Sequence, residues 1–297
     1  MRTLPSQIAV PRSSEAVTAE VKKLLRAAEV RNQLPTPRSQ ILACARLIEM
    51  GDLNLADYEE SLTDKAAGFF HRAMNKVLGF LDRRAKQLYV DPQLQDSRKL
   101  FVTYHEVIHH ITPWQHFAYT EDDDTTLSRE CRTLFESEAN YGAADVLFQC
   151  ERFETEARDF DISMPSALYL AQKYGASCHS SLRRFVERNN RPCLLLVLKA
   201  TSRVHADGNT SFFISYSIPS AAFTLQFGEP FAQVYINPDH ELGQILNNGF
   251  QGEIGLSDLK GFCRPCVVEC FTNNYHVFVL IYPKDIAHAR RTVHFRS

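Results

Sequence analysis

Two histidines four residues apart constrain this chain more than any other feature. They stand at the ends of His105-Glu106-Val107-Ile108-His109. In a helix, residues four apart share one face, so both imidazoles can bind a single divalent metal ion. Glu106 then lies beside the metal without binding it, where a carboxylate can take a proton from water. The stretch therefore predicts a helix that carries a hydrolytic zinc site.

A catalytic zinc site needs a third protein ligand, and a carboxylate on a second helix can supply it. Glu136 is suited to this role because the small residues that follow it would let its helix approach the first helix closely. Asn140 lies one turn after Glu136, so we expect it to hydrogen-bond a ligand histidine. Glu138 is the competing third ligand. The predicted metal ligands are His105, His109 and Glu136, and the predicted general base is Glu106.

The residues after His109 exclude one class of zinc peptidase. Metzincins need glycine and histidine at the third and sixth places after this histidine, but Thr112 and Gln115 stand there. Zinc follows from the ligand types, although manganese or iron also suits two histidines and a carboxylate. Further polar residues are expected near the site rather than as ligands. One of them should stabilise an oxyanion, and the candidates are His110, His116, Tyr119 and Tyr141.

Composition and charge exclude several other classes of protein. The net charge of −2 provides no basic field for nucleic acid or an anionic membrane. No stretch has the length and apolar character of a signal peptide or a membrane span, so we expect a cytoplasmic protein that does not bind membranes. The eight cysteines are scattered and do not indicate a disulfide framework. Cys263, Cys266 and Cys270 are interpreted as buried or loop thiols, with a second metal site or a redox sensor as the alternatives.

The amino-terminal half shows helical periodicity around one hairpin. Residues 1–16 lack a period and predict a flexible arm. Helices are expected over 17–30 and 37–50, and Val77–Leu81 with Lys86–Asp91 predicts a hairpin whose second strand is a sheet edge. Such an edge could hold an extended peptide substrate through main-chain bonds. Asp96 or Ser97 should cap the metal-binding helix, and Pro113 should end it.

The carboxy-terminal half changes character near residue 191. Before it, Met164–Asn190 predicts two helices joined at Gly175, an arrangement like a helix-turn-helix. Arg183, Arg184 and Arg188 could contact phosphates if the second helix were exposed, but packing is the favoured role. After it, apolar runs alternate with turns up to Tyr282, which predicts a strand-rich domain with one helix near residues 240–247.

Three segments together resemble the ImmA/IrrE family of bacterial metallopeptidases, and the resemblance covers roughly residues 20–190. They are Tyr104–His110, Glu136–Asn140 and Ala143–Leu147, which match a helical HExxH followed by E-x-x-A-N and a small-residue helix. The resemblance implies the same ligands and base as the spacing does. It also implies a protein substrate, a helix-turn-helix transcriptional repressor, whose cleavage derepresses DNA-damage, stress or mobile-element genes. Longer members of the family, of the radiation-response regulator type, carry a central helix-turn-helix and a GAF-like carboxy-terminal domain.

The sequence thus predicts an α+β protein that is a zinc-dependent endopeptidase with glutamate as third metal ligand. Its expected parts are an arm (1–16), a mostly helical zincin-like metallopeptidase domain with a small sheet (17–160), a helix-turn-helix-like segment (161–190) and a strand-rich GAF-like sensor domain (191–297). One rival hypothesis is a non-catalytic DNA-binding regulator with a structural metal. Another is a ligand-sensing module with a vestigial peptidase site. The expected partner is the repressor protein, DNA binding is less favoured, and no oligomeric state is indicated.

Overall fold

The computed structural model describes residues 10–50, 79–121, 128–199, 203–204, 208–231, 234–249, 251–286 and 291–293. The chain divides into two compact units. One, the amino-terminal unit, comprises Val10–Arg152 and Lys173–Ser177; the other, the carboxy-terminal unit, includes Phe153–Gln172 and Cys178–Ser297. Most of segment 161–190 therefore belongs with the strand-rich region. The predicted α+β class is confirmed. Among the described residues, no helix is long and apolar enough to cross a membrane.

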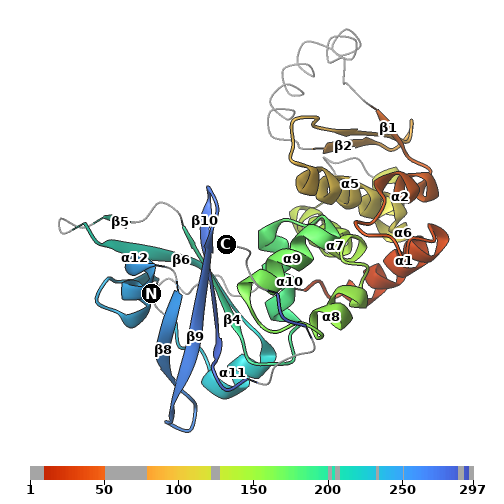
Figure 1. The fold of residues 1–297 in the computed structure, drawn as a ribbon. Coiled ribbons are helices and arrows are strands. Elements are labelled where there is room, and N and C mark those ends of the chain that lie inside the picture. Colours follow the sequence, from red (N-terminus) through yellow and green to blue (C-terminus); the bar gives the residue numbers. More distant parts are fainter. Residues whose placement is uncertain are drawn as a thin grey trace. The chain divides into compact units, whose positions relative to one another are not determined.

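Helices form most of the amino-terminal unit (Figure 1). The two longest, α5 (Asp96–Ile111) and α7 (Arg129–Leu147), pack against each other, and α1 (Ser14–Ala27) lies on α7. Val17 and Val21 of α1 are fully buried, which confirms the helix predicted over 17–30. Residues 1–9 of the predicted arm lie outside the described residues, and α1 begins within its last part.

The hairpin belongs to a three-stranded sheet in the order β1-β3-β2, formed by β1 (Ile48–Met50), β2 (Gly79–Asp82) and β3 (Gln87–Val90). The antiparallel β2–β3 pair confirms the hairpin, except for residues 77–78, which lie outside the described residues. The prediction that the second strand is an edge was wrong, because β1 pairs parallel to it. Among the described strands, β1 and β2 are the edges.

The strand β1 replaces the end of the helix predicted over 37–50. Instead, α2 covers only Arg38–Ala45. Arg46 adopts a left-handed conformation with φ 56°, and the N–H of Leu47 donates to the carbonyl of Leu42 at 2.9 Å. This geometry closes a helix and turns the chain out of it. The apolar spacing therefore predicted a helix that is too long, because spacing alone does not show where a left-handed residue ends the helix.

The boundaries of α5, the helix that carries His105 and His109, agree in part with the prediction. Gln95 occupies the N-cap position of α5 without a side-chain hydrogen bond, so the predicted cap at Asp96 or Ser97 was wrong. Asp96 lies in the first turn, where a negative charge favours the helix amino terminus. The helix does end before Pro113 as predicted. Pro113 also begins a helix that was not predicted, α6 (Pro113–Glu121), because proline suits the first helical position.

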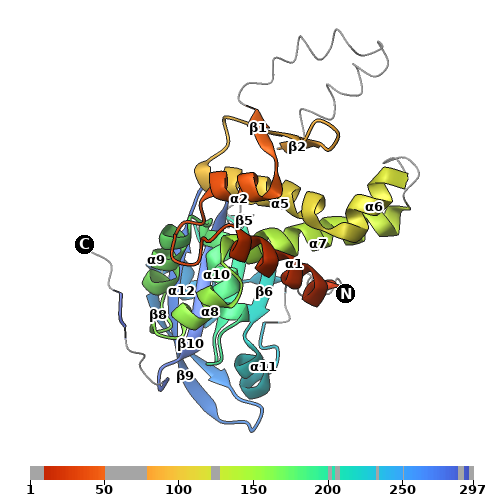
Figure 2. The same cartoon turned by 90° about the vertical axis from the view of Figure 1, so that its right-hand side faces the viewer.

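The carboxy-terminal unit is built on an antiparallel sheet (Figure 2), with the order β5-β6-β4-β10-β9-β8 and β7 beside β6. The strands are β4 (Leu194–Lys199), β5 (Arg203–Val204), β6 (Thr210–Pro219), β7 (Tyr235–Ile236), β8 (Gln251–Ser257), β9 (Cys263–Thr272) and β10 (His276–Pro283). One sheet face forms a core with α11 (Ala221–Phe227) and α12 (Glu241–Asn248). The strand-rich region and the helix near 240–247 are confirmed, whereas α11 was not predicted.

The helix pair is confirmed as α9 (Met164–Tyr174) and α10 (Cys178–Glu187), separated by Gly175 at φ +65°. A short helix that was not predicted, α8 (Glu151–Ala157), precedes the pair. The helix α10 packs on β4 and β6 and buries its apolar residues there. Its Arg184 is 9% exposed and pairs with Glu154 at 2.8 Å. The packing role favoured for α10 agrees with these contacts.

The three clustered cysteines lie on β9 and do not form a metal site. In a strand, Cys263 and Cys266 point to opposite sheet faces because they are three residues apart. Cys263 is exposed, whereas Cys266 is buried in the core. Burial raises the pKa of the Cys266 thiol to about 12, with a further contribution from Asp285. Cys266 is therefore a buried protonated thiol, as interpreted from the sequence.

Candidate metal centre

The predicted ligands come together in the structure. His105 and His109 follow one another along α5, and their Nε2 atoms are 3.1 Å apart. Glu136 on α7 places Oε2 3.3 Å from Nε2 of His105 and Oε1 3.3 Å from Nε2 of His109. Tetrahedral ligands about 2.0–2.1 Å from zinc are roughly 3.3 Å apart. This group could therefore hold a metal ion.

Close packing of α5 on α7 brings Glu136 to the histidines. At Gly142 of α7, an added Cβ would lie only 2.9 Å from three side-chain carbons of Ile108 on α5. Ala139 and Ala143, on either side of Gly142, are fully buried. Small residues after Glu136 thus let the two helices approach closely, as the sequence predicted. The Glu136 side chain remains 57% exposed, so the group is open to solvent on that side.

Each ligand histidine is held by an amide through its other ring nitrogen. Oδ1 of Asn140 lies 3.2 Å from Nδ1 of His105, and Oε1 of Gln115 lies 2.6 Å from Nδ1 of His109. An amide oxygen only accepts, so in both cases Nδ1 donates and the lone pair lies on Nε2. The predicted contact of Asn140 is confirmed. The contact of Gln115 was missed, although Pro113 just before it signalled that a new helix begins there.

Glu138, the competing third ligand, is not part of the group. It is 1% exposed and accepts hydrogen bonds from Nε1 of Trp114 at 2.9 Å and from Nε2 of Gln115 at 2.6 Å. The hydroxyl of Ser13 donates to its other oxygen. Glu138 stands two residues after Glu136, so the two side chains leave the helix in different directions. The hydrogen bonds then hold the Glu138 carboxylate away from the ligand atoms.

Glu106 lies beside the ligands and against the small sheet. An added Cβ at Gly79 of β2 would lie 3.7 Å from Cγ of Glu106. Burial raises the pKa of Glu106, although the charges of His105 and His109 oppose that rise. A carboxylate with a raised pKa is a stronger base once ionised.

The pKa values of Glu136 and His105 are shifted by the contact between these two side chains. The imidazoles of His105 and His109, whose Nε2 atoms lie 3.3 Å from the two carboxylate oxygens, hold the pKa of Glu136 well below its usual range. Burial lowers the pKa of His105, but the contact with Glu136 and the charge of Glu106 outweigh that effect and raise it. Glu136 is therefore anionic at neutral pH, as a carboxylate ligand must be.

The described candidates for the oxyanion donor contact side chains outside the metal-ligand group. The Tyr141 hydroxyl accepts from Thr18 of α1 at 3.4 Å. The rings of His110 and His116 meet edge to face, with centroids 6.0 Å apart. The side chain of Tyr119 lies outside the described residues. The oxyanion-stabilising residue thus stays undetermined among the four.

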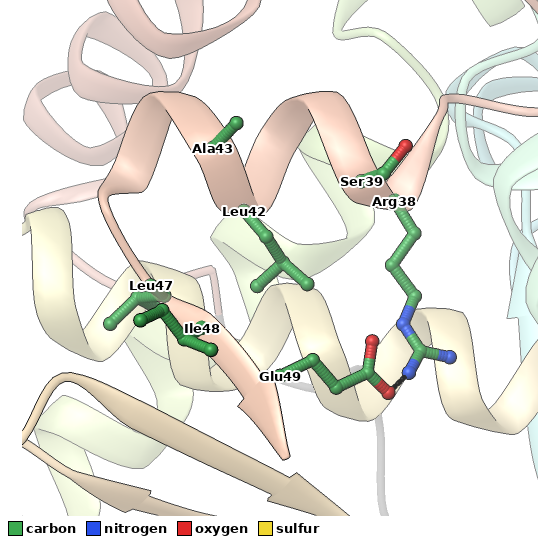
Figure 3. Close-up of a pocket in the computed structure, with 7 residues that line it drawn as sticks. All are labelled: Arg38, Ser39, Leu42, Ala43, Leu47, Ile48 and Glu49. Carbon is green, nitrogen blue, oxygen red and sulfur yellow. Dashed lines mark ion pairs between the residues drawn. The ribbon is translucent and has the colours of Figure 1, made fainter. Parts of the chain in front are cut away.

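A separate open pocket of about 610 Å³ lies on α2 and β1 (Figure 3). The side chains of Arg38 and Glu49 form an ion pair in it. Its lining residues are Arg38, Ser39, Leu42, Ala43, Leu47, Ile48 and Glu49. None of them belongs to the metal-ligand group, so this pocket is not the metal centre.

Comparisons with known proteins show a fold and no family. No family model matches the chain, and no curated protein matches its sequence. A solved structure described as a Mycobacterium tuberculosis transcriptional regulator is similar, with a TM-score of 0.53 and 13% sequence identity. The match covers 90% of this chain and 76% of that chain. At this identity the similarity shows a shared fold alone.

Proposed function

We propose that the protein is a zinc-dependent endopeptidase. One observation carries the proposal: a ligand atom from each of His105, His109 and Glu136 lies within 4.8 Å of the others. Both histidines direct Nε2 toward Glu136, and the carboxylate is anionic. The donor set therefore fits zinc. The exposed side of Glu136 leaves room for water and a substrate.

The chain's own residues would perform the proton transfers. Zinc at these three ligands supplies Lewis acidity toward water and a peptide carbonyl. Glu106 takes the proton from the attacking water and later returns it to the leaving amine. The raised pKa of Glu106 suits both steps, because a carboxylate with a low pKa takes up a proton only weakly. The amide contacts of Asn140 and Gln115 orient the two histidines meanwhile.

The edge strand β2 is the proposed docking strand for an extended substrate. Its Gly79 packs against α5 beside Glu106, so a peptide added to β2 would run past the base. Main-chain pairing of this kind ignores side-chain identity. The substrate class, a helix-turn-helix repressor, rests on the family resemblance of the sequence motifs. We infer a GAF-like sensor role for the carboxy-terminal unit from its antiparallel sheet with packed helices.

A non-catalytic DNA-binding regulator is the second candidate. The transcriptional regulator with a similar fold favours it. The arginines expected to contact phosphates count against it, since Arg183 pairs with Glu187 at 2.7 Å and Arg184 pairs with Glu154. Duplex binding that weakens steeply with salt would favour this candidate.

The decisive experiment incubates the metal-loaded full-length protein with the helix-turn-helix repressor encoded beside it. A single cut is expected. Glu106→Gln should slow it by about 10²–10⁴-fold, the usual contribution of a general base, while metal content is retained. Glu130→Gln is the matched control, because Glu130 is an exposed carboxylate in the first turn of α7. Unchanged cleavage by Glu106→Gln would refute the assigned base, and no cleavage of any neighbouring repressor would favour the regulator.

A further inference from the structure

Gln115 links a metal-ligand histidine to a buried carboxylate. Its Oε1 lies 2.6 Å from Nδ1 of His109, and its Nε2 donates to Oε2 of Glu138 at 2.6 Å. Gln115 is fully buried, and His109 and Glu138 are 4% and 1% exposed. Water therefore does not substitute for either contact. The three side chains form a chain of hydrogen bonds that ends at Nδ1 of His109.

The carboxylate determines the direction of this chain. An ionised carboxylate only accepts hydrogen bonds. Its other partners are consistent with the ionised form, because Nε1 of Trp114 can only donate and the Ser13 hydroxyl donates as well. The amide group of Gln115 that faces Glu138 must then be the NH₂. Its oxygen consequently faces His109.

This direction selects the tautomer of His109. Because Oε1 of Gln115 can only accept, the proton of the neutral imidazole lies on Nδ1. The lone pair then lies on Nε2, which faces Glu136 and His105. A reversed Gln115 would place its oxygen against Glu138 and the proton on Nε2. Such a histidine has no lone pair on the nitrogen that faces Glu136 and His105.

We propose that Gln115 and Glu138 are positioning residues: the charge of Glu138 orients Gln115, and Gln115 holds His109 in its metal-binding tautomer. The role in metal binding rests on the proposed function, but the tautomer does not. Neither residue was expected in this role from the sequence. Gln115 belongs to α6 and Glu138 to α7, and only the fold places them beside His109.

The first test measures metal affinity of the full-length protein by competition with a chelator, using Zn²⁺ and Co²⁺. Gln115→Met keeps the side-chain length and removes both hydrogen bonds. Loss of such a support typically weakens metal binding about 10–100-fold. Glu138→Leu should weaken it by a similar factor. Glu138→Gln should weaken it less, because its amide oxygen can still accept.

Gln149→Met is the matched control. Gln149 is also a buried glutamine of the amino-terminal unit, and its Nε2 donates to the carbonyls of Val30 and Gln33. It should lower stability without changing the metal affinity of the folded protein. Equal affinity of Gln115→Met and the wild type would overturn the positioning role while leaving the peptidase proposal intact. Equal loss in Gln149→Met would overturn it as well.

The second test needs neither bound metal nor a stable variant of Gln115 or Glu138. Nitrogen NMR of the metal-free protein with ¹⁵N-labelled histidine, at pH 8, reports which ring nitrogen carries the proton. The His109 signal is identified by its absence in His109→Gln. Protonated Nδ1 in the wild type is expected and supports the inference. Protonated Nε2 would overturn the inference, even if the wild type binds metal. Protonated Nδ1 in a wild type that does not bind metal would refute only the peptidase proposal.

Discussion

Adding one methyl group at Gly142 should disturb the metal centre from a distance. In Gly142→Ala the new Cβ would lie 2.9 Å from three carbons of Ile108, where ordinary contacts begin at 3.4 Å. The helices α5 and α7 must therefore separate by about 0.5 Å, whereas metal–ligand distances tolerate about 0.2 Å. We expect zinc affinity to fall about tenfold or more.

Stability should change less than affinity in this variant. Alanine favours a helix interior over glycine by about 1 kcal/mol, and overpacking costs about 1–3 kcal/mol. The net loss expected is about 0–2 kcal/mol. Chelator competition measures the affinity, and urea unfolding of the metal-free protein measures the stability.

Ile108→Ala provides the control, because it removes the three carbons that the new methyl group would meet. The double variant should show a coupling of about 0.5–3 kcal/mol in stability relative to the two single variants. If Gly142→Ala were about 1 kcal/mol more stable with unchanged zinc affinity, the argument from close helix packing would be refuted.

Three further results are expected. Gly79→Ala should destabilise the amino-terminal unit by about 1–3 kcal/mol in urea unfolding, because its Cβ would lie 2.4 Å from Cγ1 of Val102. Burial raises the pKa of Cys193 from 9.0 to about 12, so the native state keeps a proton that the unfolded state loses above pH 9. The free energy of unfolding should therefore fall by about 1.4 kcal/mol per pH unit between those values, and Cys193→Ala should remove that share of the slope. Arg184→Met should destabilise by about 3 kcal/mol because it leaves Glu154 buried and charged, and the added replacement Glu154→Leu should recover most of the loss in the same assay.

Local patterns were sufficient for the ligand helix. The spacing of His105 and His109 places them on one face of any helix, and no other part of the chain is needed for that. The same holds for Glu136 and Asn140, one turn apart, and for the turn at Gly175, whose positive φ suits glycine. The hairpin and the strand-rich region follow from short alternating runs in the same way.

Other features depended on residues far apart in the chain. The position of β3 inside its sheet required pairing with Ile48–Met50, which the local apolar spacing assigned to a helix. The burial of Arg184 required Glu154 from a different helix. The face of β9 on which each cysteine lies became evident only from the strand register.

By itself, then, the sequence determined which side chains can bind a metal, because a helix converts spacing along the chain directly into a shared face. Tertiary structure alone decided how those side chains are held. Gln115 contacts His109 from α6 and is itself held by Glu138 of α7, and a hydrogen-bond partner supplied across the fold leaves no periodic pattern in the sequence.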